Sequence, residues 1–221
     1  MDAPTSGAGL DKAKTAAHRA MERSNLYGFL AAVYREEPTP EFLRRLKDPP
    51  FLQALAAAGV ILGQDFLDVC DEELAFGLSL EYTRLFLGPG KHVSPYASVH
   101  LPAGGGSLYG APTAAVKRFI ESTGAQYRPD YRGLPDHISV ELEFMQLVVL
   151  AEAKAWGSQD HEQAKKCVSI EKEFIDTHLA GWMPVFREKV CQQAELSFYC
   201  QMAKMTQEFL GMERDELGTT A

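Results

Sequence analysis

One histidine and two carboxylates have types and spacing that could do chemistry in this chain. Asp136 and His137 follow a loop and open a helical pattern, and Glu141 lies one helical turn beyond His137. Residues four apart share a helix face, so His137 and Glu141 could act as a pair of metal ligands. A single spacing of this kind is common by chance, and no second histidine lies nearby. A small helical metalloenzyme therefore stays an alternative.

Asp136 and His137 also allow a reading as a binding site. An aspartate at a helix start accepts hydrogen bonds from free backbone N–H groups and complements the helix dipole. His137 comes one residue later, beside a loop, where we expect its imidazole to be reachable and to donate or accept a hydrogen bond near neutral pH. The pair would place a negative and a switchable group at the rim of a cleft.

Aromatic residues mark a second candidate region at 81–90, where a helical pattern breaks into Gly-Pro-Gly. Tyr82 and Phe86 are candidates for the walls of a peptide groove, because aromatic rings supply large contact areas at low entropic cost. For Leu85, packing in the core is the stronger interpretation. The sequence thus predicts contact surfaces at this helix end.

An irregular segment follows this helix end. In it, Pro95 stiffens the chain, Tyr96 could stack on a ligand, and Ser98 could hydrogen-bond a ligand backbone. The Gly-Gly-Gly-Ser run at 104–107 lacks the Gly-Lys-Ser/Thr ending of a phosphate-binding loop, and the chain has no Gly-x-Ser-x-Gly motif. We therefore predict a binding protein, with no catalytic residue, metal or cofactor.

Helices must position these residues, because the sequence shows helical periodicity and no period-two strand or hairpin signal. This periodicity predicts helices at 11–35, 41–47, 51–58, 64–87 with a break near 70, 112–123, 136–156, 160–178 and 184–211. The fold class is all-α: a single-domain bundle of roughly eight to ten helices, with one long internal Gly/Pro-rich loop at 88–112. We expect residues 1–10 to form a disordered tail, 11–211 the domain, and 212–221 a frayed tail.

Composition and net charge restrict the classes of partner that this chain could bind. The chain has 221 residues, 46% of them hydrophobic, and a net charge of -8. This charge argues against nucleic acid, which needs a clustered basic surface, and suits a basic peptide. No apolar run is long enough for membrane insertion, and no export signal opens the chain, so we expect a cytoplasmic location. The four cysteines form no motif, and we expect reduced thiols.

At these residues the chain resembles the TorD/DmsD family of redox-enzyme maturation chaperones. The matching segments are Glu-Tyr-x-x-Leu-Phe-x-Gly-Pro at 81–89, Ser-Pro-Tyr-Ala-Ser at 94–98, Leu-Tyr-Gly at 108–110, Pro-Asp-His-Ile-x-x-Glu-Leu-x-Phe-Met at 135–145, and His-Leu-x-x-Trp-x-Pro-x-Phe at 178–186. Their order and spacing agree from 81 to 186, while the first third matches only in being helical.

The resemblance implies an all-helical cytoplasmic protein that is not an enzyme. Such proteins bind the twin-arginine signal peptide of a molybdenum-containing oxidoreductase, often bind its apo form too, and hold it until its cofactor is inserted. The resemblance maps the peptide surface onto Tyr82, Leu85, Phe86, Pro95, Tyr96, Ser98, Asp136 and His137, to which we add Glu141. Some relatives carry an acidic residue just before the Asp-His pair, where this chain has Gly-Leu-Pro at 133–135.

The leading hypothesis is a groove between the 82–98 region and the helix start at 136. The apolar part of the leader would lie against Tyr82, Leu85, Phe86 and Tyr96, and its arginines near Asp136 or another acidic group. One alternative is a chaperone that grips the mature part of a membrane-bound molybdoenzyme and ignores the leader. The other is the metalloenzyme that uses His137 and Glu141. A monomer and a domain-swapped dimer are both compatible with the sequence.

Overall fold

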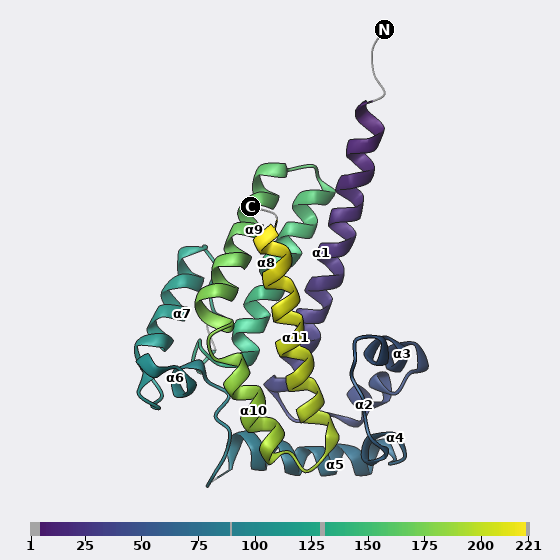
Figure 1. The fold of residues 1–221 in the computed structure, drawn as a ribbon, viewed down its shortest axis with the longest axis vertical. Coiled ribbons are helices and arrows are strands. Elements are labelled where there is room, and N and C mark those ends of the chain that lie inside the picture. Colours follow the sequence, from purple (N-terminus) through teal and green to yellow (C-terminus); the bar gives the residue numbers. More distant parts are fainter. Residues whose placement is uncertain (1–4, 89, 129–130, 220–221) are drawn as a thin grey trace.

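Long helices dominate the computed structural model, which describes residues 5–88, 90–128 and 131–219, with side chains from 11 to 218. They are α1 (Thr5–Arg35), α8 (Ile138–Gly157), α9 (His161–Phe174), α10 (Met183–Gln193) and α11 (Ser197–Thr219), and they form a bundle (Figure 1). No strand occurs among the described residues, where eleven α-helices are found. The prediction of an all-α fold is confirmed.

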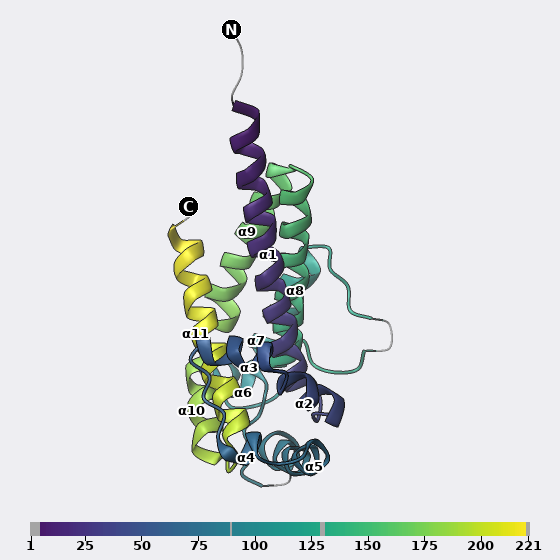
Figure 2. The same cartoon turned by 90° about the vertical axis from the view of Figure 1, so that its right-hand side faces the viewer.

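Shorter helices lie at the lower end of this bundle and on two of its sides (Figure 1). They are α2 (Pro40–Leu46), α3 (Pro49–Ala57), α4 (Gln64–Leu67), α5 (Asp71–Tyr82), α6 (Ala97–His100) and α7 (Ala111–Ser122). A π-helix, Thr83–Leu87, prolongs α5, and another, Ile175–Leu179, prolongs α9. Figure 1 shows α5 crossing below the bundle, and Figure 2 shows α2 beside the lower end of α1. Among the described helices, none is both long and apolar enough to cross a bilayer.

Local sequence explains where these helices begin and end. Proline occupies the first turn of α2, α3 and α7, where its missing N–H leaves no hydrogen bond unmade. Thr39 caps α2 by accepting from Phe42 N at 3.2 Å, and Asp160 caps α9 by accepting from Gln163 N at 3.0 Å. Gly124, at φ 86°, lies just after α7. These boundaries fall close to those the sequence predicts.

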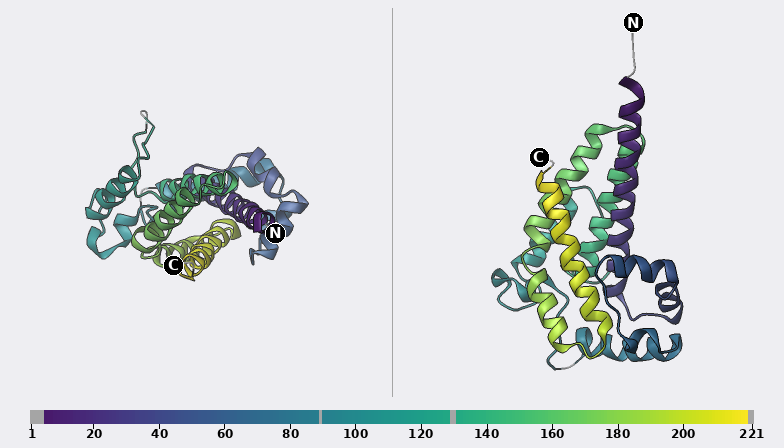
Figure 3. Two further views of the ribbon diagram at one scale, coloured as in Figure 1. Left: turned by 90° about the horizontal axis from the view of Figure 1, so that it is seen from above. Right: turned by 45° about the vertical axis from the view of Figure 1, so that its right-hand side comes forward.

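The core forms where α1 packs along α8 and where α10 and α11 close the bundle, as the view from above shows (Figure 3). Tyr27, Leu30 and Tyr34 on α1 are fully or almost fully buried. Trp182 and Phe186, from the segment that enters α10, are fully buried as well. Burial of such apolar side chains is the dominant favourable contribution to the stability of a folded domain.

The predicted continuous helix at 184–211 is wrong, because α10 ends at Gln193 and α11 begins at Ser197. The break contains neither glycine nor proline. Side chains from other helices stabilise it instead: Glu81 accepts from Leu196 N at 2.9 Å, and Asp65 accepts from Ser197 N at 2.6 Å. These tertiary hydrogen bonds satisfy the backbone N–H groups of the new helix start. Such contacts leave no local signal in the sequence.

Other boundaries also differ from the expectations. The long loop at 88–112 contains α6 and a short 3₁₀ helix, Pro102–Gly104. Residues 5–10, expected to be disordered, belong to α1, and residues 212–219, expected to fray, belong to α11. The remaining parts of both predicted tails, 1–4 and 220–221, lie outside the described residues.

Two cysteines depart from the expectation of reduced thiols. Cys191 and Cys200 form a disulfide, with their Cα atoms 4.5 Å apart. The break between α10 and α11 folds these positions back on each other, which one straight helix would not allow. Cys70 and Cys167 are free.

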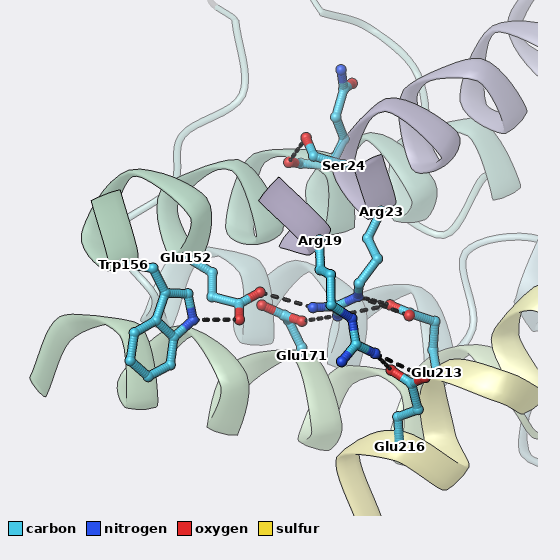
Figure 4. Close-up of polar contacts among 9 residues, drawn as sticks. Arg19, Arg23, Ser24, Glu152, Trp156, Glu171, Glu213 and Glu216 are labelled. Atoms are coloured by element: carbon cyan, nitrogen blue, oxygen red, sulfur yellow. Dashed lines mark hydrogen bonds and ion pairs between the residues drawn. The ribbon is translucent and has the colours of Figure 1, made fainter. Parts of the chain in front are cut away.

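A buried ionic cluster ties α1 to three other helices (Figure 4). Arg23 of α1 contacts Glu152 of α8 at 2.8 Å, Glu213 of α11 at 2.7 Å, and Glu171 of α9. The carboxylate side chains are at most 7% exposed. Burial raises the pKa of Glu171 to about 8, and repulsion from Glu152 and Glu213 acts in the same direction, while Arg23 opposes both. One guanidinium therefore does not balance all of these carboxylates.

This cluster makes stability depend on pH. Glu171 keeps its proton up to about pH 8 in the folded chain, against 4.5 for an ordinary glutamate. The folded state then binds more protons between these values, so the free energy of unfolding should fall as pH rises from about 4.5 to about 8, by at most ~1.4 kcal/mol per pH unit. Glu171→Gln mimics the protonated form and should flatten this dependence in urea unfolding at several pH values. The exposed Glu173→Gln is the control; equal slopes in both variants would contradict the prediction.

Candidate functional site

A cavity of about 480 Å³ lies beside the first turns of α8. Its wall includes Tyr96, Tyr127, Tyr131, His137, Phe144 and Leu147, and its charged lining residues are Arg35, Arg128 and Glu143. We call it the tyrosine pocket. Three separate parts of the chain build it: the end of α1, the segment around Tyr96, and the stretch from the end of α7 into α8.

Two of the predicted motifs meet at this pocket through their backbones. Ala97 N donates to Asp136 O at 2.9 Å, and Ile138 N donates to Pro95 O at 2.9 Å. The pairing sets Tyr96 opposite His137 as an isolated antiparallel bridge, with ring centroids 4.9 Å apart in an edge-to-face arrangement. The structure therefore brings the 94–98 segment against the start of α8.

His137 is the residue that caps α8, although the sequence suggested Asp136 for this role. Its Nδ1 accepts from Ser139 N at 3.2 Å and lies 2.7 Å from Ser139 Oγ. Accepting through Nδ1 leaves the ring proton on Nε2 in the neutral form. Burial lowers the pKa of His137 to about 4; Asp136 opposes this effect, and the charge of Arg35 adds to it. The expected switch near neutral pH is therefore wrong, and the pocket wall is uncharged here at pH 7.

Asp136 is fully buried and stabilises the backbone that surrounds the site. Its Oδ2 accepts from Ser98 N at 2.9 Å, in the first turn of α6, and Ser98 is itself fully buried. A carboxylate in this position holds the 94–98 segment against α8. In this conformation its side chain offers no surface to a peptide, so the idea that arginines of a ligand sit at Asp136 needs correction.

Glu141 is likewise buried, one turn into α8. It accepts a hydrogen bond from Trp182 Nε1 at 3.3 Å, and burial raises its pKa well above the usual value. Among the described residues, no group of three or more His, Cys, Asp or Glu side chains could hold a metal ion. The pair of His137 and Glu141, on which the metalloenzyme alternative depends, has no further ligand there.

The aromatic candidates from 82 to 86 lie in the core. Tyr82 donates to Tyr34 O at 3.0 Å, and its ring lies 5.2 Å from that of Phe86. Phe86 packs in turn against Tyr199, at 5.5 Å between ring centroids, and Leu85 is fully buried. In this conformation they do not line the tyrosine pocket. Packing, the alternative for Leu85, accounts for all of them.

Pro95 is buried and holds its place through the bond to Ile138 N. Of the expected peptide-binding residues, Tyr96 and His137 are the ones that line the tyrosine pocket. The role of every expected residue in peptide binding stays a prediction.

Sequence reasoning missed the tyrosines of the loop between α7 and α8. Tyr127 and Tyr131 stack with ring centroids 5.8 Å apart, and Tyr131 donates to Leu134 O at 2.9 Å. Burial raises the pKa of Tyr131 to about 12, so its phenol stays neutral. Figure 2 shows this loop extending away from the bundle beside α8. The spacing of two tyrosines in a glycine-bounded loop was a signal that could have been used.

The family comparison decides where this fold belongs. The family model described as nitrate reductase delta subunit matches residues 51–188, more than half of the chain. The chain belongs to this family. The matched span contains Tyr96, Tyr127, Tyr131, His137 and Glu143, whereas α1, which supplies Arg35, lies outside it.

The chain is also similar in sequence to proteins that have names. The chain is 25% identical over 210 residues to the chaperone protein TorD of Vibrio vulnificus strain YJ016, covering 89% of this chain and 94% of the relative. It is 36% identical over 104 residues to the selenate reductase assembly chaperone protein of Thauera selenatis, covering 47% and 52% of the two chains. A solved structure of a redox enzyme maturation protein from Archaeoglobus fulgidus aligns with TM-score 0.48 and 20% identity, over 89% of this chain and 93% of that one.

We expect loss of the Asp136 carboxylate to lower the stability of the folded chain. In Asp136→Ala, Ser98 N stays buried without its acceptor, which should lower the free energy of unfolding by about 1–3 kcal/mol. Chemical unfolding followed by circular dichroism measures this. Asp68→Ala, an exposed aspartate, is the control; equal stability of the two variants would show that the bond to Ser98 contributes little.

Proposed function

We propose that this chain is an assembly chaperone for a molybdenum-containing oxidoreductase, and that it binds the twin-arginine signal peptide of that enzyme in the tyrosine pocket. Membership of the nitrate reductase delta subunit family supports the chaperone role, together with relatives named TorD and selenate reductase assembly chaperone. The observation that carries the binding site is the pairing of the 94–98 segment with the start of α8 around one cavity.

The pocket suits the apolar part of such a leader. Tyrosine rings and Leu147 provide apolar contact area, and Leu147 is 55% exposed before any ligand binds. Covering such surface supplies affinity, reduced by the cost of ordering the peptide. The phenol and imidazole groups at the wall are neutral at pH 7, so they do not oppose an apolar ligand. No covalent bond is made or broken, and the chain acts in the cytoplasm, before export.

A second candidate function is binding of the mature apo-enzyme without its leader. An exposed apolar stripe on α5 and the following π-helix favours it: Phe76, Leu80 and Leu87 are 67%, 57% and 64% exposed. Phe76 and Leu80 are one helical turn apart and share a face. Exposed apolar side chains that gather on one face are typical of a protein interaction site. This stripe is separate from the tyrosine pocket.

Point substitutions test the leader site. In Leu147→Ser and Tyr96→Ala, loss of apolar contact should weaken binding of a synthetic leader by roughly 5- to 30-fold, as measured by calorimetry. Met212→Ser is the matched control, because Met212 is 65% exposed on α11 and does not line the pocket. Wild-type affinity in both pocket variants would refute this site.

The second candidate needs a separate measurement. Phe76→Ser combined with Leu80→Ser should reduce recovery of a leaderless apo-enzyme in a pulldown, because the exposed apolar contact is removed, while leader affinity stays unchanged. Loss of leader affinity in this double variant, with the apo-enzyme still recovered, would reverse the assignment of the two surfaces.

A further inference from the structure

The charged groups at the tyrosine pocket pose a problem for a ligand that carries two arginines. Asp136 and Glu141 are fully buried. Among the described residues that line the pocket, Glu143 is the one carboxylate, and Arg35 and Arg128 are the cationic residues. The local balance therefore does not follow the net charge of -8. A leader arginine can gain a carboxylate in this pocket through Glu143.

Glu143 already holds a guanidinium. Nη2 of Arg35, the last residue of α1, lies 3.0 Å from Glu143 Oε2. Their side chains are 46% and 48% exposed, so water and an incoming ligand reach both. The pair also lies close to the pocket wall, since the charge of Arg35 acts on His137 and that of Glu143 on Tyr131. An arginine side chain is thus already seated on this carboxylate, at the rim of an aromatic cavity.

We infer that Glu143 recognises an arginine of the bound leader and that Arg35 occupies its place until the leader arrives. This inference rests on the proposed leader binding. An exposed ion pair contributes little to the stability of the fold, so exchanging Arg35 for a ligand arginine costs little. Glu143 pairs with a guanidinium both before and after the exchange. A peptide without a cation would leave Arg35 in place and gain no contact with Glu143.

The surroundings of Glu143 favour arginine over lysine. A planar guanidinium can contact both carboxylate oxygens and stack on an aromatic ring, whereas an ammonium group is a strongly hydrated point charge. Tyr96 and Tyr131 line the same cavity as Glu143 and supply such rings. The apolar run after the arginines would then continue toward Leu147, which is exposed and lies one helical turn after Glu143 on α8. The order of groups along α8 thus matches the order in a leader.

Fluorescence anisotropy with labelled peptides tests this inference. Three synthetic leaders share one apolar run and differ only in the preceding pair: Arg-Arg, Lys-Lys or Gln-Gln. Wild-type protein should bind the Arg-Arg peptide about three- to fivefold more tightly than the Gln-Gln peptide, with Lys-Lys between them, because a half-exposed ion pair contributes at most about 1 kcal/mol. Glu143→Gln should bind all three alike. Arg35→Gln should bind the Arg-Arg peptide roughly threefold more tightly than wild type, since no internal guanidinium competes.

Asp176→Asn is the matched control. Asp176 forms an ion pair with Arg214 at 2.7 Å, of comparable exposure, and neither residue lines the pocket. It should keep the wild-type order of affinities. If Glu143→Gln keeps the preference for Arg-Arg, the assignment of Glu143 is wrong while leader binding stands. If Arg35→Gln binds no more tightly than wild type, Arg35 does not compete. A wild-type chain that binds none of the peptides overturns the proposed leader binding, and this inference with it.

Discussion

A short backbone pairing holds this site together. The hydrogen bonds from Ala97 N to Asp136 O and from Ile138 N to Pro95 O join segments that are about forty residues apart in the chain. Asp136 adds a buried bond to Ser98 N. Each buried backbone group must find a partner, so the irregular segment cannot leave α8 without exposing or orphaning several of them. The tyrosine pocket exists because this connection is fixed.

The same connection divides the predicted motif residues into two groups. Those that face the bundle, such as Asp136 and Ser98, become part of the frame, and those that face away, Tyr96 and His137, become part of the pocket wall. Residues that are adjacent in the sequence therefore have different roles in the site. Substitution of a frame residue would change binding through the shape of the site, and this must be separated from the loss of a direct contact with a ligand.

Helical periodicity was enough to predict the fold class and most helices, because the 3.6-residue period and the proline and glycine positions are local signals. It could not tell which face of a helix end is buried, so Tyr82 and Phe86 were assigned to a groove although they pack against Tyr199. The break at 194–196 depends on Glu81, and the pocket depends on Arg35, both distant in sequence. The family resemblance is confirmed, yet it also could not identify α1 as part of the site.

The distribution of charge limits how a cationic leader can approach. A net charge of -8 attracts arginines over a distance of about one Debye length, but it does not specify where they stop. Close to the pocket, Arg35 and Arg128 repel a second cation, whereas Glu143 attracts one. A leader that placed both arginines inside the cavity would leave one of them near Arg128 without a carboxylate. Binding with the arginines at the rim and the apolar run inside avoids this cost, because buried unpaired charge is far more unfavourable than exposed charge.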